Sequence, residues 1–555
     1  MTKGLILEAL LIPLFWFLMF VFFTSVGFVL GAFKRQSGTL STNLFTWFWY
    51  GLGVCIVFLQ IWNLFLPVNV YCWLCLLPVA IYGLTSILKS GRISIGRPTG
   101  VALILLIAIL VFLVISSLDN LFIYDSLVYH FYSIKWFNNY PVIPGMGNLF
   151  IYLGFNQSYF LFPAFLNSIW GGYKGACAAN GLLAVVICYE VILLNQNIFL
   201  AKAKFTVHVV FQLLFLPLLI NVGVQNLSSP TPDVFVNILT FKVLSDLLVC
   251  IERKKMTFQD IYLLAFYCLL GVVMKVSFLG VSFGILGVVI YYTYDKKIWK
   301  LGATLQGILL LLLLLLPWIA RGIISTGYMV FPSSITGVPV DWKVPAAVMQ
   351  SISDYIIGFA RTLKHGPVAT AAAHHYKWIP GWIKIMLHSV GFVVPVTLCF
   401  GTIVALKIKR VPVKLLVMIL IPVFTSIIIW LLTAPTIRFA VFTFWSLGLL
   451  SLGYFIANIN LKWTKGFTSF VVICSVVSMA RNWNTEITPM GDLPKQFYSV
   501  FTTKSGIKIN TIKNTPPGDD WQLGDCKIPC SVFPDSNLVL RGKDINSGFK
   551  ISSAR

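Results

Sequence analysis

Apolar runs of about 20 residues recur from one end of the chain to the other, and each is long enough to cross the hydrocarbon core of a bilayer. Charged residues make up only 11% of the 555 residues, whereas a soluble globular domain carries roughly a quarter. The mean hydropathy is +0.87. The sequence therefore predicts an all-α polytopic membrane protein of about fourteen transmembrane helices.

The expected spans follow the apolar runs. Their ranges are 4–33, 44–66, 69–88, 101–118, 174–194, 205–224, 232–251, 260–274, 276–294, 300–322, 383–407, 414–433, 438–457 and 466–480. The first run is too long for the apolar region of a signal peptide and lacks a clear cleavage site, so we interpret it as a retained span. The sequence contains no visible internal repeat, which disfavours a transporter built from two related halves.

Basic residues are concentrated in alternate connections between these runs. They are Lys34 and Arg35; Lys89, Arg92 and Arg97; Lys202 and Lys204; Arg253, Lys254 and Lys255; Lys296, Lys297 and Lys300; Lys407, Lys409, Arg410 and Lys414; and Lys462 and Lys465. By the positive-inside rule these connections are cytoplasmic. Anionic lipid headgroups then explain the formal net charge of +23 better than nucleic acid does.

The other, extracytoplasmic side receives the N-terminus, the long segments 119–173 and 323–382, and the tail 481–555. The long segments hold the aromatic, acidic and histidine residues that the basic connections lack. We therefore expect the functional site on the extracytoplasmic side of the membrane.

The polar tail 481–555 is predicted to be a small β-rich or mixed domain, because short alternating stretches such as SNLVLRG occur in it. Cys526 and Cys530 are four residues apart, and in an oxidising compartment this spacing favours a local disulfide. Zinc would need two more ligands, and none lies nearby in the sequence. Whether the tail caps a site, contacts an acceptor or is a passive lid stays open.

The segment DNLFIYDSLVYHFYSIKWFNNYPVIPG, residues 119–145, is the most informative in the chain. If it is helical, Asp125 and Tyr129 lie on one face, and His130 follows directly. An acidic residue just outside a span can cap a helix N-terminus, or it can serve as a catalytic base. Both interpretations of Asp125 are open from spacing alone.

Asp233 and Lys275 stand at expected extracytoplasmic ends of spans. Asp233 follows Pro230 and Pro232 in a first helical turn, where its charge complements the helix dipole. It would also lie on the same membrane face as Asp125. Lys275 interrupts an apolar stretch that must turn near its middle, and its ammonium group can either snorkel to the surface or neutralise a phosphate.

Arg321 and Arg438 also lie at expected extracytoplasmic ends, against the positive-inside trend. Each therefore needs an anionic partner. That partner is either a carboxylate such as Asp125 or Asp233, or phosphate oxygens held in bidentate fashion.

His365, His374 and His375 cluster in KHGPVATAAAHHYKW. Their spacing matches no common metal-ligand motif. Binding of a divalent cation, hydrogen bonds to a substrate, or no functional role all remain open for these histidines.

Taken in chain order, the motifs resemble the GT-C superfamily, whose members are multi-spanning glycosyltransferases that use polyprenyl-phosphate-linked sugars. The similar groups are protein O-mannosyltransferases and lipid A aminoarabinose transferases. The resemblance covers about residues 100–480. The motifs that carry it are, in chain order, an acidic residue followed by a helix with Tyr and His and by W…Y-P…P-G, then FNQSYFLFPAFLNSIWGG, Asp233, GVVMKVSFLG, RGIISTGYMVFP and TIRFAVF. A less characterised bacterial group with a Y-D-x-x-x-Y-H segment and a C-x-x-x-C tail is also similar in the tail, where this chain has GDCKIPC, LVLRG and SGF.

The resemblance implies a GT-C-like core at 99–480, after an N-terminal extension of about three helices at 1–98. Asp125 would then be the general base, and Asp233, Tyr129 and His130 would form the acceptor side or a second acidic site. The residues implied to hold the donor phosphate are Lys275, Arg321 and Arg438. The implied reaction is an inverting transfer to a hydroxyl of a glycan, lipid or protein, on the extracytoplasmic face of a bacterial inner (plasma) membrane.

One departure and two alternatives accompany this expectation. The usual acidic pair D-E is Asp125–Ser126 here, which puts a metal or acceptor role of the second acidic residue in doubt. A transporter or flippase for lipid-linked oligosaccharides would carry charged residues near span centres, whereas the candidates above crowd at span ends. A polysaccharide polymerase or ligase that uses the same lipid-linked donors is the second alternative.

Overall fold

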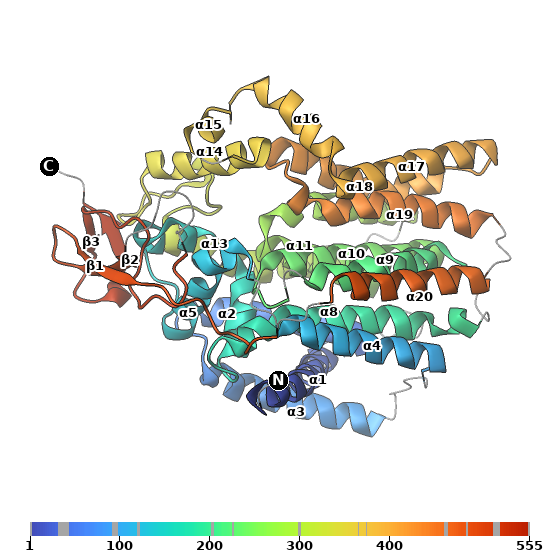
Figure 1. The fold of residues 1–555 in the computed structure, drawn as a ribbon, viewed down its shortest axis with the longest axis horizontal. Coiled ribbons are helices and arrows are strands. Elements are labelled where there is room, and N and C mark those ends of the chain that lie inside the picture. Colours follow the sequence, from blue (N-terminus) through green and yellow to red (C-terminus); the bar gives the residue numbers. More distant parts are fainter. Residues whose placement is uncertain are drawn as a thin grey trace.

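The structure is a computed structural model. It describes residues 3–30, 44–90, 98–118, 122–200, 205–224, 227–297, 301–364, 366–372, 374–459, 464–483, 487–513 and 522–552. Most long helices run side by side in a bundle, and a small strand region lies beyond one end of it (Figure 1). We call that end the tail end. The opposite end, where the expected cytoplasmic connections lie, is called the basic-loop end.

Apolar helices form the bundle. They are α1 (Lys3–Leu30), α2 (Leu44–Trp62), α3 (Val70–Ser90), α4 (Gly100–Ser117), α8 (Lys174–Asn195), α9 (Val207–Val224), α10 (Pro232–Glu252), α11 (Phe258–Met274), α12 (Leu279–Asp295), α13 (Leu301–Thr326), α17 (Val390–Ile408), α18 (Lys414–Thr433), α19 (Val441–Asn458) and α20 (Thr464–Arg481). Within the described residues, 11 helices are long and apolar enough to cross a membrane. The chain is therefore a mostly α-helical, multi-pass membrane protein. Of the other expected spans, α9 and α11 contain shorter apolar helices and α20 does not qualify, so the count of about fourteen stays a prediction.

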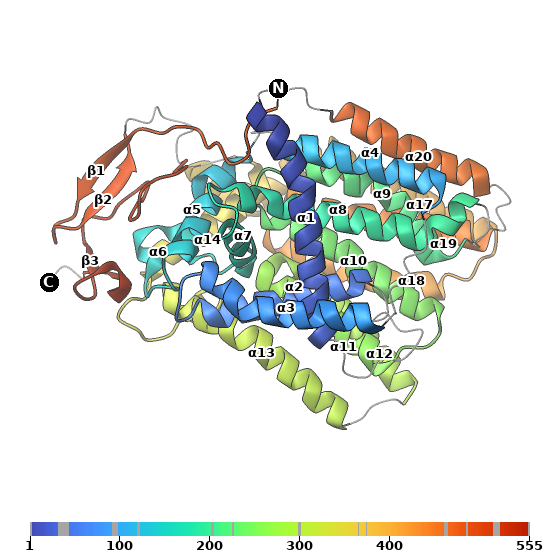
Figure 2. The same cartoon turned by 90° about the horizontal axis from the view of Figure 1, so that it is seen from below.

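Helix α1 crosses its neighbours steeply. It is seen end-on in Figure 1 and runs across α2, α3 and α8 in Figure 2. A Cβ atom on Gly51 of α2 would lie 1.9 Å from the backbone oxygen of Phe23, and one on Gly83 of α3 would lie 2.1 Å from that of Ser25. Only a residue without a Cβ lets helix backbones come this close. Helix α1 thus packs across α2 and α3 and holds them against the bundle.

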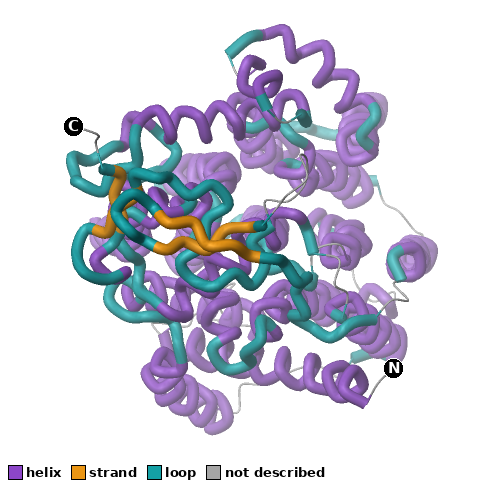
Figure 3. The backbone as a smooth tube through the Cα atoms, turned by 60° about the vertical axis from the view of Figure 1, so that its left-hand side comes forward, coloured by secondary structure: helices purple, strands orange, loops and turns teal. Residues whose placement is uncertain are grey.

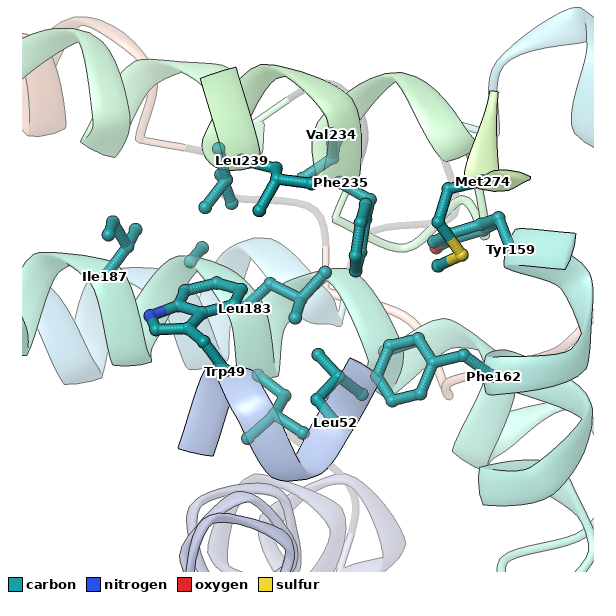
Figure 4. Close-up of a cluster of buried hydrophobic side chains, with 14 of the residues drawn as sticks. Trp49, Leu52, Tyr159, Phe162, Leu183, Ile187, Val234, Phe235, Leu239 and Met274 are labelled. Carbon is teal, nitrogen blue, oxygen red and sulfur yellow. The ribbon is translucent and has the colours of Figure 1, made fainter. Parts of the chain in front are cut away.

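The bundle core lies where α2, α8 and α10 meet. Figure 4 shows Trp49 and Leu52 of α2, Leu183 and Ile187 of α8, and Phe235 of α10 gathered in one cluster, and all five are buried. Lipid tails are as apolar as these side chains, so close packing rather than removal from water stabilises the contact. This packed core fixes the positions of the helix termini at the tail end.

Short helical segments cover the tail end. They are η2 (Ser126–His130), α5 (Phe131–Asn139), α6 (Met146–Leu149), η3 (Ile151–Gly154), η4 (Ser158–Phe160), α7 (Leu161–Asn167), η6 (Val276–Phe278), η7 (Ser334–Thr336), α14 (Ala346–Thr362), α15 (Pro367–Ala372), η8 (Tyr376–Trp378), α16 (Ile379–Leu387) and η9 (Ile437–Phe439). A further short segment, η5 (Gln196–Leu200), follows α8 at the basic-loop end.

The C-terminal region is a small strand region, as the alternating pattern of the sequence predicts. Strands β1 (Tyr498–Thr502) and β2 (Lys508–Ile512) pair antiparallel, with Val500 opposite Asn510. Strands β3 (Leu538–Leu540) and β4 (Phe549–Ile551) form a second antiparallel pair, and a short 3-10 turn, η10 (Ile545–Ser547), lies between them. Figure 3 shows the strands in front of the helix ends when the tail end is turned forward.

Candidate functional site

Four charged residues that the sequence singles out meet at the tail end of the bundle. We call Asp125, Asp233, Lys275 and Arg438 the charge cluster. Arg438 donates from Nη2 to Asp125 Oδ2 at 2.6 Å and from Nε to Asp233 Oδ2 at 3.1 Å. Lys275 Nζ donates to Asp233 Oδ1. Two carboxylates and two cations thus share one place, although Asp125 and Arg438 are 313 residues apart in the sequence.

Each member of the charge cluster stands where a helix begins, ends or is interrupted. Asp125 directly precedes the π-helical turn η2. Asp233 lies in the first turn of α10, next to Pro232, and its backbone N–H donates to the side chain of the N-cap Thr231. Lys275 is the C-cap of α11, and Arg438 lies in η9 between α18 and α19. The breaks that the apolar helices make at the tail end therefore bring polar side chains together there.

The cluster has an accessible half and a shielded half. The side chains of Asp125 and Arg438 are 34% and 45% exposed, whereas those of Asp233 and Lys275 are 15% and 16% exposed. Burial lowers the pKa of Arg438, but Asp233 and Asp125 outweigh this and raise it above its usual range, so the guanidinium stays charged. Asp125 and Arg438 are therefore the solvent-accessible pair of the cluster, and Asp233 with Lys275 supports them.

Aromatic side chains border Asp125. Tyr129 is buried and stacks on Tyr152, with ring centroids 5.4 Å apart. Burial, and then the charges of Asp125 and Asp233, raise the pKa of Tyr129, so its hydroxyl stays neutral. Tyr355 of α14 lies within electrostatic range of Asp125, and burial first of all raises its pKa. Sequence reasoning found Tyr129 but missed Tyr152 and Tyr355, because no spacing rule relates α14 to residue 125.

His130 is buried beside the charge cluster. Its Nδ1 lies 2.8 Å from Ser126 Oγ. Burial lowers the pKa of His130 to about 3, although Asp125 and Asp233 pull it upward. The imidazole is therefore neutral at physiological pH and takes part in the site by hydrogen bonding and packing rather than by charge.

Acid should destabilise the fold through His130. In the unfolded chain a histidine takes up a proton near its usual pKa of about 6.5, whereas the folded chain binds it only near pH 3. Stability should thus fall as the pH drops below about 6.5, by about 1.4 kcal/mol for each pH unit. Thermal unfolding in detergent at pH 7 and pH 5 measures this loss.

His130→Gln should remove that part of the acid sensitivity, whereas His388→Gln, at an exposed histidine of α16's C-terminus, should retain it. Equal acid sensitivity of wild type and His130→Gln would show that His130 does not titrate in this way.

Arg321 lies apart from the charge cluster. Its guanidinium is buried, donates from Nη1 to Asn63 Oδ1 at 2.5 Å, and lies over the ring of Phe137 with 4.9 Å to the centroid. Its hydrogen-bond partner within the described residues is therefore an amide, neither of the two predicted carboxylates. The structure does not bring Arg321 to the residues with which it was expected to hold a phosphate.

Two of the three predicted histidines, His374 and His375, lie in the described part of the chain. His374 is exposed, and its Nε2 lies 3.0 Å from Asp354 Oδ1 of α14. His375 is also exposed, ahead of η8, and His365 lies outside the described residues. In the part of the chain that the structure describes, no group of three or more His, Cys, Asp or Glu residues is placed to hold a metal ion.

The GDCKIPC motif of the tail lies against the segment that carries Asp125. Gly524 N–H donates to Leu127 O of η2 at 2.9 Å. Asp525 accepts from Lys135 Nζ of α5 at 2.6 Å, and Tyr132 donates its hydroxyl to Cys530 O at 2.9 Å. Cys526 and Cys530 are joined in a disulfide, as their spacing predicts.

The other two tail motifs also dock on the tail end of the bundle. Arg541 of LVLRG pairs with Asp341 at 3.0 Å and lies over the ring of Trp342. In SGF, Phe549 N–H donates to Pro144 O at 2.9 Å. Gly548 has a φ of +88°, a backbone conformation that favours glycine. The tail is thus docked at several points on the tail end of the bundle.

Reduction of the disulfide should loosen the tail. Closing the short loop from Cys526 to Cys530 stabilises the folded tail by about 2 kcal/mol through the lost freedom of the unfolded loop. We expect limited proteolysis of the tail to become about thirtyfold faster on reduction. A Cys526→Ser/Cys530→Ser variant should be cleaved at the faster rate with or without reductant. Cleavage of the wild type that does not respond to reductant would contradict a stabilising role of the disulfide.

Three further charged residues lie inside the bundle, and the sequence reasoning passed over them. They are Glu190 of α8 and Lys242 and Asp246 of α10, all buried. Lys242 is the central residue of α10. The expectation that the charged residues crowd at span ends is therefore wrong for this group, because ion pairing lets charged side chains sit between packed helices.

The comparisons with known proteins give a family but no function. No curated protein and no solved structure matches the chain. A family described as a domain of unknown function, DUF8201, matches residues 10–445. The match includes all four residues of the charge cluster and ends before the tail. The chain therefore belongs to the DUF8201 family.

Proposed function

We propose that this protein is an inverting membrane glycosyltransferase. It moves a sugar from a polyprenyl-phosphate-linked donor to a hydroxyl group of a glycan, lipid or protein acceptor, on the extracytoplasmic face of a bacterial inner membrane. The charge cluster carries the proposal, because it sets an accessible carboxylate beside an accessible arginine at the ends of apolar helices, next to aromatic rings. The order of the motifs along the chain, which resembles that of the GT-C superfamily, supports it.

The chemistry follows from the two halves of the cluster. The acceptor oxygen attacks the anomeric carbon and gives its proton to Asp125 as the bond from that carbon to the phosphate oxygen breaks. Arg438 and Lys275 stabilise the negative charge that develops on the departing polyprenyl phosphate. A single displacement of this kind inverts the anomeric carbon.

Phosphate binding would also free the base. Without substrate, Arg438 donates a hydrogen bond to Asp125 Oδ2 at 2.6 Å, so that oxygen already has a donor. A phosphate that takes over Arg438 leaves Asp125 free for the acceptor hydroxyl. Asp233 keeps its ion pair with Lys275, which holds the ammonium group in position for the donor phosphate.

Binding of polyprenyl phosphate to the protein in lipid nanodiscs tests this proposal. Lys275→Gln should weaken binding by about tenfold or more, since a charge-assisted contact contributes about 1.5–3 kcal/mol. The matched control is Lys377→Gln, at an exposed lysine of η8, which should bind like the wild type. Equal affinity of Lys275→Gln and wild type would contradict the assignment of Lys275 to the donor phosphate.

One observation favours a second candidate function, a flippase or transporter for lipid-linked oligosaccharides. Ionisable residues inside a membrane bundle often mark a transport pathway, and Glu190, Lys242 and Asp246 lie there. Protein-dependent movement of a fluorescent lipid-linked sugar across proteoliposomes, without product formation, would support that function. Product formation without such movement would support the glycosyltransferase.

A further inference from the structure

Glu190, Lys242 and Asp246 form a compact ionic group between α8 and α10. Lys242 Nζ lies 2.9 Å from Glu190 Oε1, and 2.7 and 2.8 Å from the two carboxylate oxygens of Asp246. The side chains of Glu190, Lys242 and Asp246 are only 4%, 3% and 6% exposed. We call them the buried triad.

The group is closely packed on the side of α2. Trp49 donates its indole N–H to the second oxygen of Glu190 at 2.9 Å. Trp49 also lies in the packed core where α2, α8 and α10 meet (Figure 4). The hydrogen bonds of Lys242 and Trp49 thus use both oxygens of Glu190 and fix its orientation.

The charges of the buried triad do not balance. Two carboxylates surround one ammonium group, so the fully ionised triad carries one excess negative charge. The groups near it on the neighbouring elements are Trp49 of α2 and Tyr267 and Asp260 of α11. Tyr50 of α2 lies within electrostatic range of Tyr267, and Arg253 after α10 pairs with Asp260. Asp260 lies 3.3 Å from Arg253, so that pair adds no net charge. An unbalanced charge among packed apolar helices is strongly unfavourable.

A second observation points to the same place. The hydroxyl of Tyr267 on α11 is fully buried, has no hydrogen-bond partner among the described residues, and lies within electrostatic range of both Asp246 and Glu190. A buried hydroxyl without a partner is costly unless a polar ligand or water is nearby. The interior around the buried triad is therefore polar on the α11 side as well.

We propose that the buried triad is a proton-binding site, in which Glu190 and Asp246 share one proton around Lys242. The proton comes from a hydronium ion of the aqueous phase, whose O–H bond breaks to leave a water molecule. It is bound by one carboxylate oxygen, and the net charge of the triad changes from −1 to zero. No bond other than this O–H bond forms. Asp246 and Glu190 lie in the halves of α10 and α8 nearer the basic-loop end, so the proton exchanges with that side. The site does not depend on glycosyl transfer.

Infrared spectroscopy of the full-length protein in nanodiscs at neutral pH tests the proposal. A protonated carboxylic acid has a C=O stretching band, separate from the bands of ionised carboxylates, that shifts on exchange into D2O. The wild type should show this band. Asp246→Asn and Glu190→Gln should each abolish it. Either change leaves one carboxylate paired with Lys242, and that pair is neutral without a bound proton.

Two variants complete the test. Glu252→Gln removes a partly exposed carboxylate of α10 that pairs with His208, and the band should persist unchanged. Lys242→Met should strengthen the band, because two carboxylates then lack a cation. Absence of the band from the wild type would overturn the proposal. Persistence of the band in either Asp246→Asn or Glu190→Gln would also overturn it, since the proton would then not be shared. Both single-carboxylate variants preserve side-chain shape, so the outcome does not depend on the folding of Lys242→Met.

Discussion

Asp125→Asn should lower the rate of glycosyl transfer by at least about a hundredfold, because it removes the proposed proton acceptor and a positioned general base contributes about 10² to 10⁴ in rate. The amide has nearly the shape of the carboxylate and can still accept a hydrogen bond from Arg438. The fold and the donor affinity should therefore change little. Initial rates of the purified variant in nanodiscs, at saturating lipid-linked donor, measure the effect.

A matched carboxylate makes this result specific. Asp354 of α14 also lies at the tail end, but it pairs with His374 rather than with the charge cluster. Asp354→Asn should retain the wild-type rate within about twofold, because the Asp354 carboxylate pairs outside the charge cluster. Equal rates for wild type and Asp125→Asn would remove Asp125 as the base and direct attention to Asp233.

Arg438→Gln should lower the rate by about 10² to 10³, the loss typical when one stabilising donor is removed from a developing negative charge. Arg438 is also the residue that bridges Asp125 and Asp233. Its loss leaves Asp125 without a cation and should lower the affinity for polyprenyl phosphate. Rates and phosphate-lipid binding, measured on the same preparation, check both effects.

A conservative variant separates charge from geometry. Arg438→Lys retains the charge but not the planar fork that reaches two oxygens, so its rate should lie between those of wild type and Arg438→Gln. Arg481→Gln, at an exposed arginine that ends α20, should behave like the wild type. If Arg438→Gln retained the wild-type rate and affinity, the cluster would not bind the donor phosphate.

The hydropathy of the sequence and the positions of its charged residues predict much of the architecture. Apolar runs predict helices of membrane-spanning length, and polar residues between them mark the places where those helices end. Asp233, Lys275 and Arg438 were found because each is a charge at such an end. The carboxylate alternative for Arg438 named Asp125 and Asp233 as its partners, and the structure shows both pairs. The distances within the cluster could not be predicted, since they depend on helix packing that hydropathy does not encode.

The residues whose positions the sequence did not predict have the same physical explanation, because helix packing determines where their side chains lie. Arg321 also stands near a helix end, yet it turns toward Asn63 and Phe137, and no pattern in the sequence tells these directions apart. Tyr355 borders Asp125 only because α14 folds over the tail end. Glu190 and Lys242 were passed over because single charges in long apolar runs do not alter a hydropathy profile. Their pairing across two helices becomes visible only in three dimensions.

Turnover of lipid-linked donors by the purified wild-type protein tests the central claim most directly. The protein in nanodiscs is offered a panel of polyprenyl-phosphate sugars together with glycan, lipid and peptide acceptors, and product and free polyprenyl phosphate are both quantified. The account predicts that at least one donor yields glycosylated product and polyprenyl phosphate in equal amounts, with the anomeric configuration inverted. Absence of product with every donor, in a preparation that binds polyprenyl phosphate and moves lipid-linked sugar across vesicles, would contradict it.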